Sequence, residues 1–179
     1  FAYTPGVVVQ KTSHGQGSPF IRGFTAYNNL LLIDGIRLNN ASFRSGPNQY
    51  WATVDAQGLR GIELVKSQGS VIYGADAAGG TVQALTRSPE YADEGSHIGG
   101  RSYSRYSYGE DSFLQRGEVS LSEADRYGLI LGGTWKDFGD IRAADLGTLP
   151  FTGYEEWDVD AKLEIFLDPD TRAVSYTHL

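Results

Sequence analysis

The second half of the chain alternates between apolar and polar positions. In residues 156–167 the apolar side chains take the odd positions and the charged side chains the even ones, with Phe166 as the exception. Residues 126–138 repeat this pattern, and residues 113–124 and 98–108 carry weaker versions of it. A period of two is typical of a β-strand between water on one face and apolar material on the other. We therefore expect about four antiparallel strands in this half.

Two architectures fit these strands. In a soluble sandwich the apolar face packs against a second sheet, whereas in an outer-membrane barrel it faces lipid. Three of the connections are short, namely GEDS, SEAD and DPDT, and one is longer, GDIRAADLGTLPFTG. Short turns combined with a longer loop suit a barrel, and the strands have roughly the ten residues that a tilted strand needs to cross a bilayer. The alternation alone leaves both architectures open.

The first half, up to about Ser88, consists of short apolar runs between turns. Asp34 and Gly35 lie between two such runs and predict a hairpin turn. Residues 53–59 suggest a helical turn, and residues 69–78 a short helix. Short strands are expected within residues 6–10, 20–24, 29–38, 61–67 and 81–87. Together these elements make a small α+β unit.

Composition narrows the function further. The formal net charge of −7 argues against a nucleic-acid-binding protein, because phosphate contacts need a basic surface. The chain has no Cys, which excludes disulfides and thiolate metal ligands within it. No apolar run approaches the ~18 residues of a membrane-spanning helix. The chain opens with FAYTPG rather than with Met and stops within an expected strand, so we expect a fragment of a longer protein.

An ordered series of motifs covers the first half. It runs PGV, FIRGF, LLIDGIRL and then GIELVKSQGSVIYGADAAGGTVQALTR, which ends at Arg87. This series resembles the plug domain of TonB-dependent outer-membrane receptors, the active transporters of Gram-negative bacteria. The sequence departs from the family pattern at Ser67 and Gln68, where Gly-Pro is usual, and at Ala84 and Leu85. The resemblance implies an α+β plug domain at residues 1–90, followed by antiparallel β-strands of an incomplete transmembrane β-barrel at residues 91–179.

The resemblance also implies a function. The full protein would take up an iron chelate (a siderophore or haem) or cobalamin across the cell outer membrane, with the plug gating the barrel. Its partners would be the substrate, outer-membrane lipid and TonB, which would grip a box upstream of Phe1. Two alternatives stay open: a surface receptor or binding protein with a plug-like domain that does not transport, and a soluble carbohydrate-binding sandwich.

Transport of this kind needs a latch of reversible polar contacts between plug and barrel wall. The resemblance implies Arg22, Glu63 and Lys66 as the plug side of such a latch, because a paired charge at an internal interface loses little when it is wetted. The alternative is that Arg22 and Lys66 are solvated residues on short strands. Residues expected to serve packing and turns within the plug are Asp34, Gly35, Tyr73, Gly74, Gly79 and Gly80.

The glycine-rich stretch GADAAGG has two interpretations. Small residues would let its backbone approach the barrel wall, or they would make a turn and a helix cap as in any α+β domain. The spacing fits neither a GxGxxG nor a GxxxxGK phosphate loop. Candidate ligand contacts lie in loops rich in polar and aromatic residues, namely His14, Tyr27, Arg44, Tyr50 and Trp51.

The sequence offers no catalytic constellation. Ser13 and His14 are neighbours without a partnered acid, and no GxSxG motif occurs. The carboxylates of Glu155, Glu156, Asp158 and Asp160 could suggest a hydrolase or a Ca²⁺ site. The two-residue spacing of Glu156, Asp158 and Asp160 places these three on one strand face, which is more consistent with a water-filled lumen. We therefore expect no enzyme, no resident cofactor and no metal site.

Overall fold

The computed structural model describes residues 4–40, 45–47, 50–66 and 69–179. The chain divides into two compact units, residues 1–86 and residues 87–179. Each unit is described by itself below and is called the N-terminal or the C-terminal unit. The sequence placed a domain boundary between residues 90 and 91, and that placement stays a prediction.

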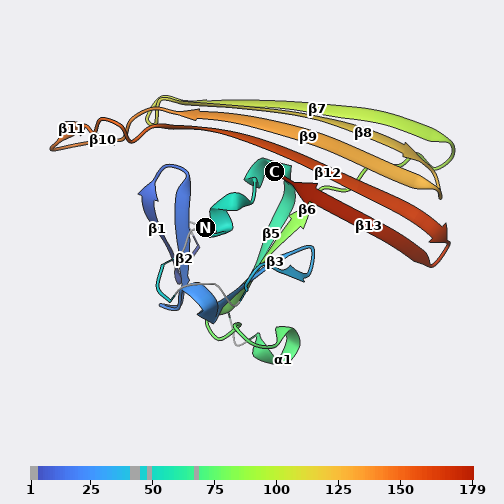
Figure 1. The fold of residues 1–179 in the computed structure, drawn as a ribbon, viewed down its shortest axis with the longest axis horizontal. Coiled ribbons are helices and arrows are strands. Elements are labelled where there is room, and N and C mark those ends of the chain that lie inside the picture. The colour runs from blue at the N-terminus through green and yellow to red at the C-terminus, as the bar shows by residue number, and fades with distance from the viewer. Residues whose placement is uncertain (1–3, 41–44, 48–49, 67–68) are drawn as a thin grey trace. The chain divides into compact units, whose positions relative to one another are not determined.

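Two small sheets form the N-terminal unit (Figure 1). Strands β1 (Val7–Ser13) and β2 (Gln16–Ile21) pair as an antiparallel hairpin. The second sheet has the strand order β4-β3-β6-β5, and its central pair β3–β6 is parallel while the outer pairs are antiparallel. Its strands are β3 (Asn29–Ile33), β4 (Ile36–Arg37), β5 (Leu59–Val65) and β6 (Gly80–Thr86).

Among the described residues, four short helices connect these strands. They are the 3₁₀-helices η1 (Ala26–Asn28), η2 (Tyr50–Thr53) and η3 (Ala56–Gly58), and the single-turn helix α1 (Ser70–Tyr73). The helical turn predicted within residues 53–59 is therefore split between two 3₁₀-helices. The helix predicted within residues 69–78 is only one turn long, because Gly74 takes a φ of 81° and ends it.

The central sheet is buried on both faces. Successive residues of β3 point to opposite faces, so Leu31 packs with Ile21 and Val82 on one side, while Leu30 and Leu32 pack with Ala77 on the other. Further side chains extend the two clusters: Leu38, Trp51 and Leu64 on the first and Tyr73 on the second. A unit with so few residues gains its own apolar core in this way.

The turn between β3 and β4 is tied to the end of β6. Asp34 and Gly35 have φ values of 47° and 83°, the positive angles of a two-residue hairpin turn. The Asp34 carboxylate also accepts hydrogen bonds from the backbone N–H of Thr86, at 2.9 Å, and from the Thr86 hydroxyl. Asp34 and Gly35 therefore fix the hairpin turn, and Asp34 also holds Thr86, the last residue of the N-terminal unit.

Crowding inside the unit explains two of its glycines. A Cβ at Gly79 would overlap Asn29 and Phe24, and a Cβ at Gly80 would lie 2.7 Å from the Val65 carbonyl oxygen. Both positions therefore require glycine because other elements of the same unit approach them. Contact between this stretch and a barrel wall stays a prediction.

The C-terminal unit is one long antiparallel meander. Five strands pair in the order β13-β12-β9-β8-β7, each with the next long strand of the chain (Figure 1). They are β7 (Ser96–Ser107), β8 (Ser112–Glu123), β9 (Tyr127–Phe138), β12 (Tyr154–Asp168) and β13 (Thr171–His178). The sheet confirms the four alternating strands, and β13 confirms the strand expected at the end of the sequence.

The connections of this sheet differ in length. Tight turns join β7 to β8, β8 to β9 and β12 to β13, whereas the connection from β9 to β12 carries a small hairpin of its own, made by β10 (Arg142–Ala143) and β11 (Gly147–Thr148). The sheet is open rather than closed into a barrel, since β7 and β13 pair on one side only among the described strands. No helix in the described ranges is long and apolar enough to cross a membrane.

Candidate functional site

The strand register separates the sheet of the C-terminal unit into two faces. Arg116 on β8 pairs with Thr134 on β9, which pairs with Asp158 on β12, so these three side chains share a face. We call it the charged face. Its charged residues include Arg101, Arg116, Glu118, Lys136, Glu156, Asp158, Asp160, Lys162 and Glu164.

The opposite face, which we call the apolar face, consists largely of aliphatic residues. Its members include Ile98, Val119, Leu121, Leu129, Leu131, Val159, Ala161, Leu163 and Ile165. Val159 is 57% exposed and Leu131 47% exposed, whereas Glu164 is 0% and Arg116 1% exposed. This burial is the inverse of that in a soluble sheet, which hides its apolar side. It is the arrangement of a strand between lipid and a polar lumen.

Aromatic residues mark both ends of the apolar face. Trp135 and Trp157 stack at 5.8 Å between ring centroids, and Phe113 lies 5.7 Å from Trp135. Tyr127 lies at the other end of β9. From Trp135 to Tyr127 the strand covers roughly 27 Å, which a tilt of about 40° reduces to about 20 Å. That height approaches the apolar band of about 25 Å, bordered by aromatic girdles, of outer-membrane barrels.

Arg116 is the centre of an ion-pair network on the charged face. Its guanidinium donates to both carboxylate oxygens of Asp160, at 2.7 and 3.1 Å, and its Nε donates to Glu118 at 3.1 Å. Arg101 also donates to Glu118, at 3.0 Å. Gly132 leaves room for this guanidinium, because a Cβ there would overlap it. The planar fork of arginine can satisfy two carboxylates at once, which keeps a buried cation paired.

The other carboxylates of β12 are paired as well. Lys136 Nζ lies 2.7 Å from Glu156 and 2.7 Å from Asp158. The three carboxylates that the sequence assigned to one strand face therefore lie on the charged face with cations beside them. Among the described residues, no group of three or more His, Cys, Asp or Glu could hold a metal ion.

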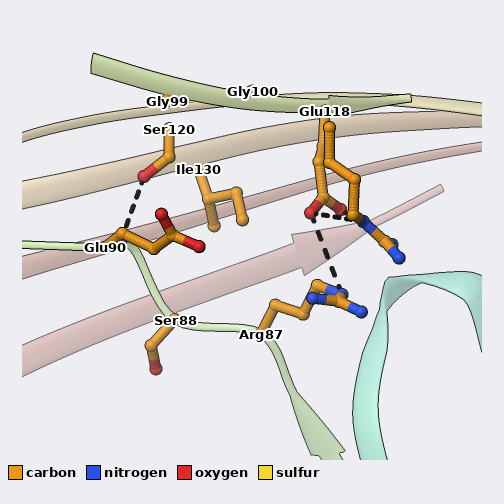
Figure 2. A pocket seen from close by; sticks show the side chains of 9 residues that line it. Arg87, Ser88, Glu90, Gly99, Gly100, Glu118, Ser120 and Ile130 are labelled. Atoms are coloured by element: carbon orange, nitrogen blue, oxygen red, sulfur yellow. Dashed lines mark hydrogen bonds and ion pairs between the residues drawn. The ribbon is translucent and has the colours of Figure 1, made fainter. Parts of the chain in front are cut away.

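A short segment that precedes β7 lies along the charged face. Together with β7, β8 and β9, residues 87–90 enclose a cavity of about 70 Å³. It is lined by Arg87, Ser88, Glu90, Gly99, Gly100, Arg101, Glu118, Ser120 and Ile130 (Figure 2). Arg87 Nε lies 3.8 Å from Glu118, and the backbone N–H of Glu90 donates to the Ser120 hydroxyl at 3.2 Å. No sequence pattern marks this segment, since contacts between it and a strand 30 residues away leave no local signal.

The predicted latch residues all lie at the surface of the N-terminal unit. Arg22 is exposed in the turn after β2, with a φ of 54°, and its backbone N–H donates to the Gly6 carbonyl at 2.8 Å. Glu63 is exposed on β5. Lys66 is exposed and its Nζ donates to the Pro5 carbonyl at 3.1 Å. Their role as a latch stays a prediction.

The candidate ligand contacts are distributed over the N-terminal unit. His14 is half-buried in the β1–β2 turn, Tyr27 is exposed in η1, and Tyr50 is exposed in η2. Trp51, beside Tyr50, packs against the cluster of Ile21, Leu31 and Val82, which gives it a structural role. Arg44 lies outside the described residues.

Arg37 is a structural cation that the sequence analysis did not single out. It pairs with Asp76 at 2.8 Å and donates to the carbonyls of Tyr73 and Ala75 at 3.2 and 3.0 Å. These contacts fix the turn after α1 on β4. Because that turn also contains Gly74 and Asp76 at positive φ, the ion pair holds an otherwise irregular backbone in place.

Comparison with known families now identifies the first half of the chain. Residues 1–81 match the family model of the TonB-dependent receptor plug domain. Residues 1–81 form a TonB-dependent receptor plug domain. Over 97 residues it is 36% identical to the vitamin B12 transporter BtuB of Vibrio vulnificus, and over 83 residues 31% identical to that of Photobacterium profundum. These matches cover 52% and 46% of this chain but only 15% and 13% of the relatives.

Solved structures extend the likeness over both units. The copper transporter OprC matches with a TM-score of 0.77 at 17% identity, covering 98% of this chain and 27% of that one. The siderophore receptor PirA of Acinetobacter baumannii matches with 0.65 at 23%, covering 98% and 27%, and the ferric enterobactin receptor PfeA of Pseudomonas aeruginosa with 0.64 at 21%, covering 98% and 28%. Because these structures are less than 25% identical to this chain, the similarity establishes a shared fold alone. In this chain a plug domain is therefore followed by antiparallel strands with the fold of the barrel strands in those structures.

Proposed function

We propose that the full-length protein is an outer-membrane transporter that takes up a large, scarce substrate, an iron chelate or cobalamin, with the plug gating the barrel. The observation that carries this proposal is the inverted burial of the sheet. In the strands that follow the plug domain, the side chains of Val159 and Leu131 are exposed, whereas those of Arg116 and Glu164 are buried. A soluble binding protein gains nothing from exposing one whole apolar face.

The charged face is the proposed lining of the lumen. Its groups are already paired with one another, as in the contacts of Arg116 with Asp160 and of Lys136 with Asp158. Pairs of this kind tolerate the entry of water, because hydration replaces part of what the pair loses. A lumen lined in this way allows a plug to be displaced without exposing a dry apolar interface.

The plug side of the gate is proposed to carry the latch. Arg22, Glu63 and Lys66 are exposed on the N-terminal unit, so their charges are available to a partner. We propose that they pair with charges on the barrel wall and that TonB, gripping a box N-terminal to Phe1, pulls the plug against these pairs. Exposed pairs are individually weak, about 0–1 kcal/mol each, so a modest force separates them.

The substrate class follows from the relatives only as a proposal. The relatives at 36% and 31% identity are vitamin B12 transporters, which puts cobalamin first among the candidates. The structural neighbours include receptors for siderophores, which puts ferric siderophores second. We propose no catalytic activity, because a gate opened by force needs no covalent step.

The test is uptake by the full-length protein. The gene would be expressed in a Gram-negative host that lacks its own cobalamin and siderophore receptors, and radiolabelled cobalamin and ferric siderophores would be offered with and without TonB. We expect heat-modifiable protein in the outer-membrane fraction and uptake that disappears without TonB. Binding at the surface without accumulation would instead identify a receptor that does not transport. A product outside the membrane fraction would contradict the barrel.

A further inference from the structure

Residues 87–91, which we call the strap, are bound to the charged face more closely than a simple linker requires. On both sides of Glu90 the backbone is held by hydroxyls of β8. The Glu90 N–H donates to Ser120 at 3.2 Å, and the Ser122 hydroxyl donates to the Glu90 carbonyl at 2.6 Å. Two serines on one strand thus satisfy a backbone donor and a backbone acceptor of a segment that belongs to no strand.

Tyr91 attaches the strap to the next strands of the sheet. Its hydroxyl donates to Glu164 on β12 at 3.2 Å, and its ring meets Phe166 edge-on, with 5.6 Å between centroids. Glu164 is fully buried, and Arg172 donates to it at 3.1 Å. The tyrosine and Arg172 therefore donate to the same oxygen, Oε2, of a buried carboxylate, while the tyrosine ring packs on an aromatic neighbour.

Gly128 on β9 leaves the space that the Tyr91 side chain occupies, which we call the socket. A Cβ at Gly128 would overlap the Tyr91 ring and hydroxyl and would lie 2.8 Å from Pro89 Cβ. Gly133, on the same strand but on the other face, meets nothing closer than 3.8 Å. Three strands therefore contribute to seating the strap: β8 by hydroxyls, β9 by an absent side chain and β12 by a carboxylate.

The contacts between the strap and the charged face become weaker towards the N-terminal end of the strap. Ser88 accepts a hydrogen bond from Lys162 at 3.3 Å, and Arg87 reaches Glu118 only at 3.8 Å. Thr86, the residue before, belongs to β6 and to the N-terminal unit. A pulling force applied through Thr86 would consequently load the weak contact of Arg87 first and the contacts of Tyr91 last.

We propose that the strap is a fixed anchor, with Tyr91 as its positioning residue. When the plug moves, residues 88–91 stay on the barrel wall and the chain hinges at Thr86 and Arg87. This inference rests on the proposed function, since it concerns where the moving part of the gate ends. The opposite behaviour, in which the strap leaves the wall together with the plug, is the competing description.

The seating of the strap is tested by amide hydrogen exchange in the full-length receptor. We expect Tyr91→Phe to speed exchange at the amides of Ser88, Glu90 and Tyr91 by about tenfold, the loss of one hydrogen bond to a charged acceptor. Tyr108→Phe, at a tyrosine that is 79% exposed, is the matched control and leaves these rates unchanged. Gly128→Ala should act like Tyr91→Phe, and Gly133→Ala should not. Unchanged exchange in both Tyr91→Phe and a folded Gly128→Ala receptor would overturn the seating.

The fixed position is tested by pulling. A single full-length receptor in a bilayer would be stretched through a tether at the N-terminus of its plug. In the wild type we expect release to stop with the strap bound, and in Tyr91→Ala we expect a further extension from residues 87–95, about 30 Å for nine residues. Release of these nine residues together with the plug in the wild type, or the same extension in both proteins, would overturn the anchor. Because pulling needs no substrate, a failure of uptake would count against the proposed function alone.

Discussion

The two units bury opposite kinds of side chain. In the plug, Leu30 and Val82 are fully buried and the charged candidates are exposed. In the sheet of the C-terminal unit, Glu164 and Arg116 are buried while Val159 is exposed. Burial of apolar side chains stabilises a unit in any position of that unit, because the hydrophobic effect requires no specific partner across an interface. The plug thus carries its own cohesion, whereas the sheet of the C-terminal unit buries paired charges on one face and leaves apolar side chains exposed on the other.

A charge introduced into the plug core should have the largest effect and tests whether apolar burial holds this unit together. Val82→Asp places an unpaired carboxylate at a fully buried position, which should cost about 4 kcal/mol or more and unfold the plug. Limited proteolysis of the full-length receptor in its membrane measures this as rapid cleavage within residues 1–86. Val8→Asp is the control, because Val8 is 66% exposed. Equal protection in both variants would show that the plug is not held by this core.

The complementary change removes the central cation of the charged face. Arg116→Ala leaves Asp160 and Glu118 without their shared donor, and breaking a buried pair in this way costs about 3–5 kcal/mol. We expect the barrel to lose its heat-modifiable migration at a lower temperature. Arg126→Ala, at an exposed arginine, should leave that temperature unchanged. A double variant, Arg116→Met with Asp160→Leu, should be milder than the single change, and a more severe double variant would contradict the pairing argument.

A charge on the apolar face should have a smaller effect that depends on depth. Leu131→Lys, near the middle of the face, should destabilise the folded barrel by about 2–4 kcal/mol, and Ile165→Lys, near its end, by about 0–1 kcal/mol. Denaturant titration of the full-length protein refolded into bilayers measures both. An equal cost at the two positions would mean that this face does not cross a membrane.

Alkaline pH should loosen the strap. Burial, and then the negative charge of Glu164, raise the pKa of Tyr91 from about 10 to about 12. A group whose pKa is raised on folding contributes fully below its unfolded value, and its contribution is lost as pH rises through the folded value. Exchange at the strap amides, corrected for intrinsic rates, should therefore rise between pH 10 and pH 12 in the wild type. In Tyr91→Phe this additional rise should be absent.

The smallest expected effect concerns the connection between β9 and β12. Asp140 accepts hydrogen bonds from the backbone N–H groups of Thr152 and Gly153, both at 2.8 Å, and these bonds lower the pKa of its carboxyl. Asp140→Ala should loosen the base of this connection and speed proteolysis within residues 140–153. Asp145→Ala, in the tip of the small hairpin, is the control. The wild type should show the same loosening only when pH falls below the lowered pKa.

Local pattern and motif order explain what could be predicted. The period of two in residues 156–167 follows from strand geometry, and the hairpin at Asp34 and Gly35 follows from backbone angles, so both were readable from neighbouring residues. The pattern could not decide between lipid and a second sheet on the apolar side. The ordered plug motifs supplied that choice.

The contacts of the charged face could not be predicted. Arg116 meets Asp160 across 44 residues, and which carboxylate it meets depends on the register of two intervening strand pairs. The socket at Gly128 is equally invisible, because a missing side chain in a strand has many explanations until its neighbour Tyr91 is placed. In the plug, Gly79 and Gly80 suggested an approach to a wall, and their crowding proved to come from the plug itself.

The meander order has a consequence for the speed of assembly. Most strands of the sheet follow their partners after only a few residues, so each new pairing closes a short loop and loses little chain entropy. The pairing of β9 with β12 is different, because the chain between Phe138 and Tyr154 must first fold back on itself. Assembly of this sheet would therefore proceed hairpin by hairpin and pause at that one step. In the folded sheet the Asp140 carboxylate joins the two ends of this long connection.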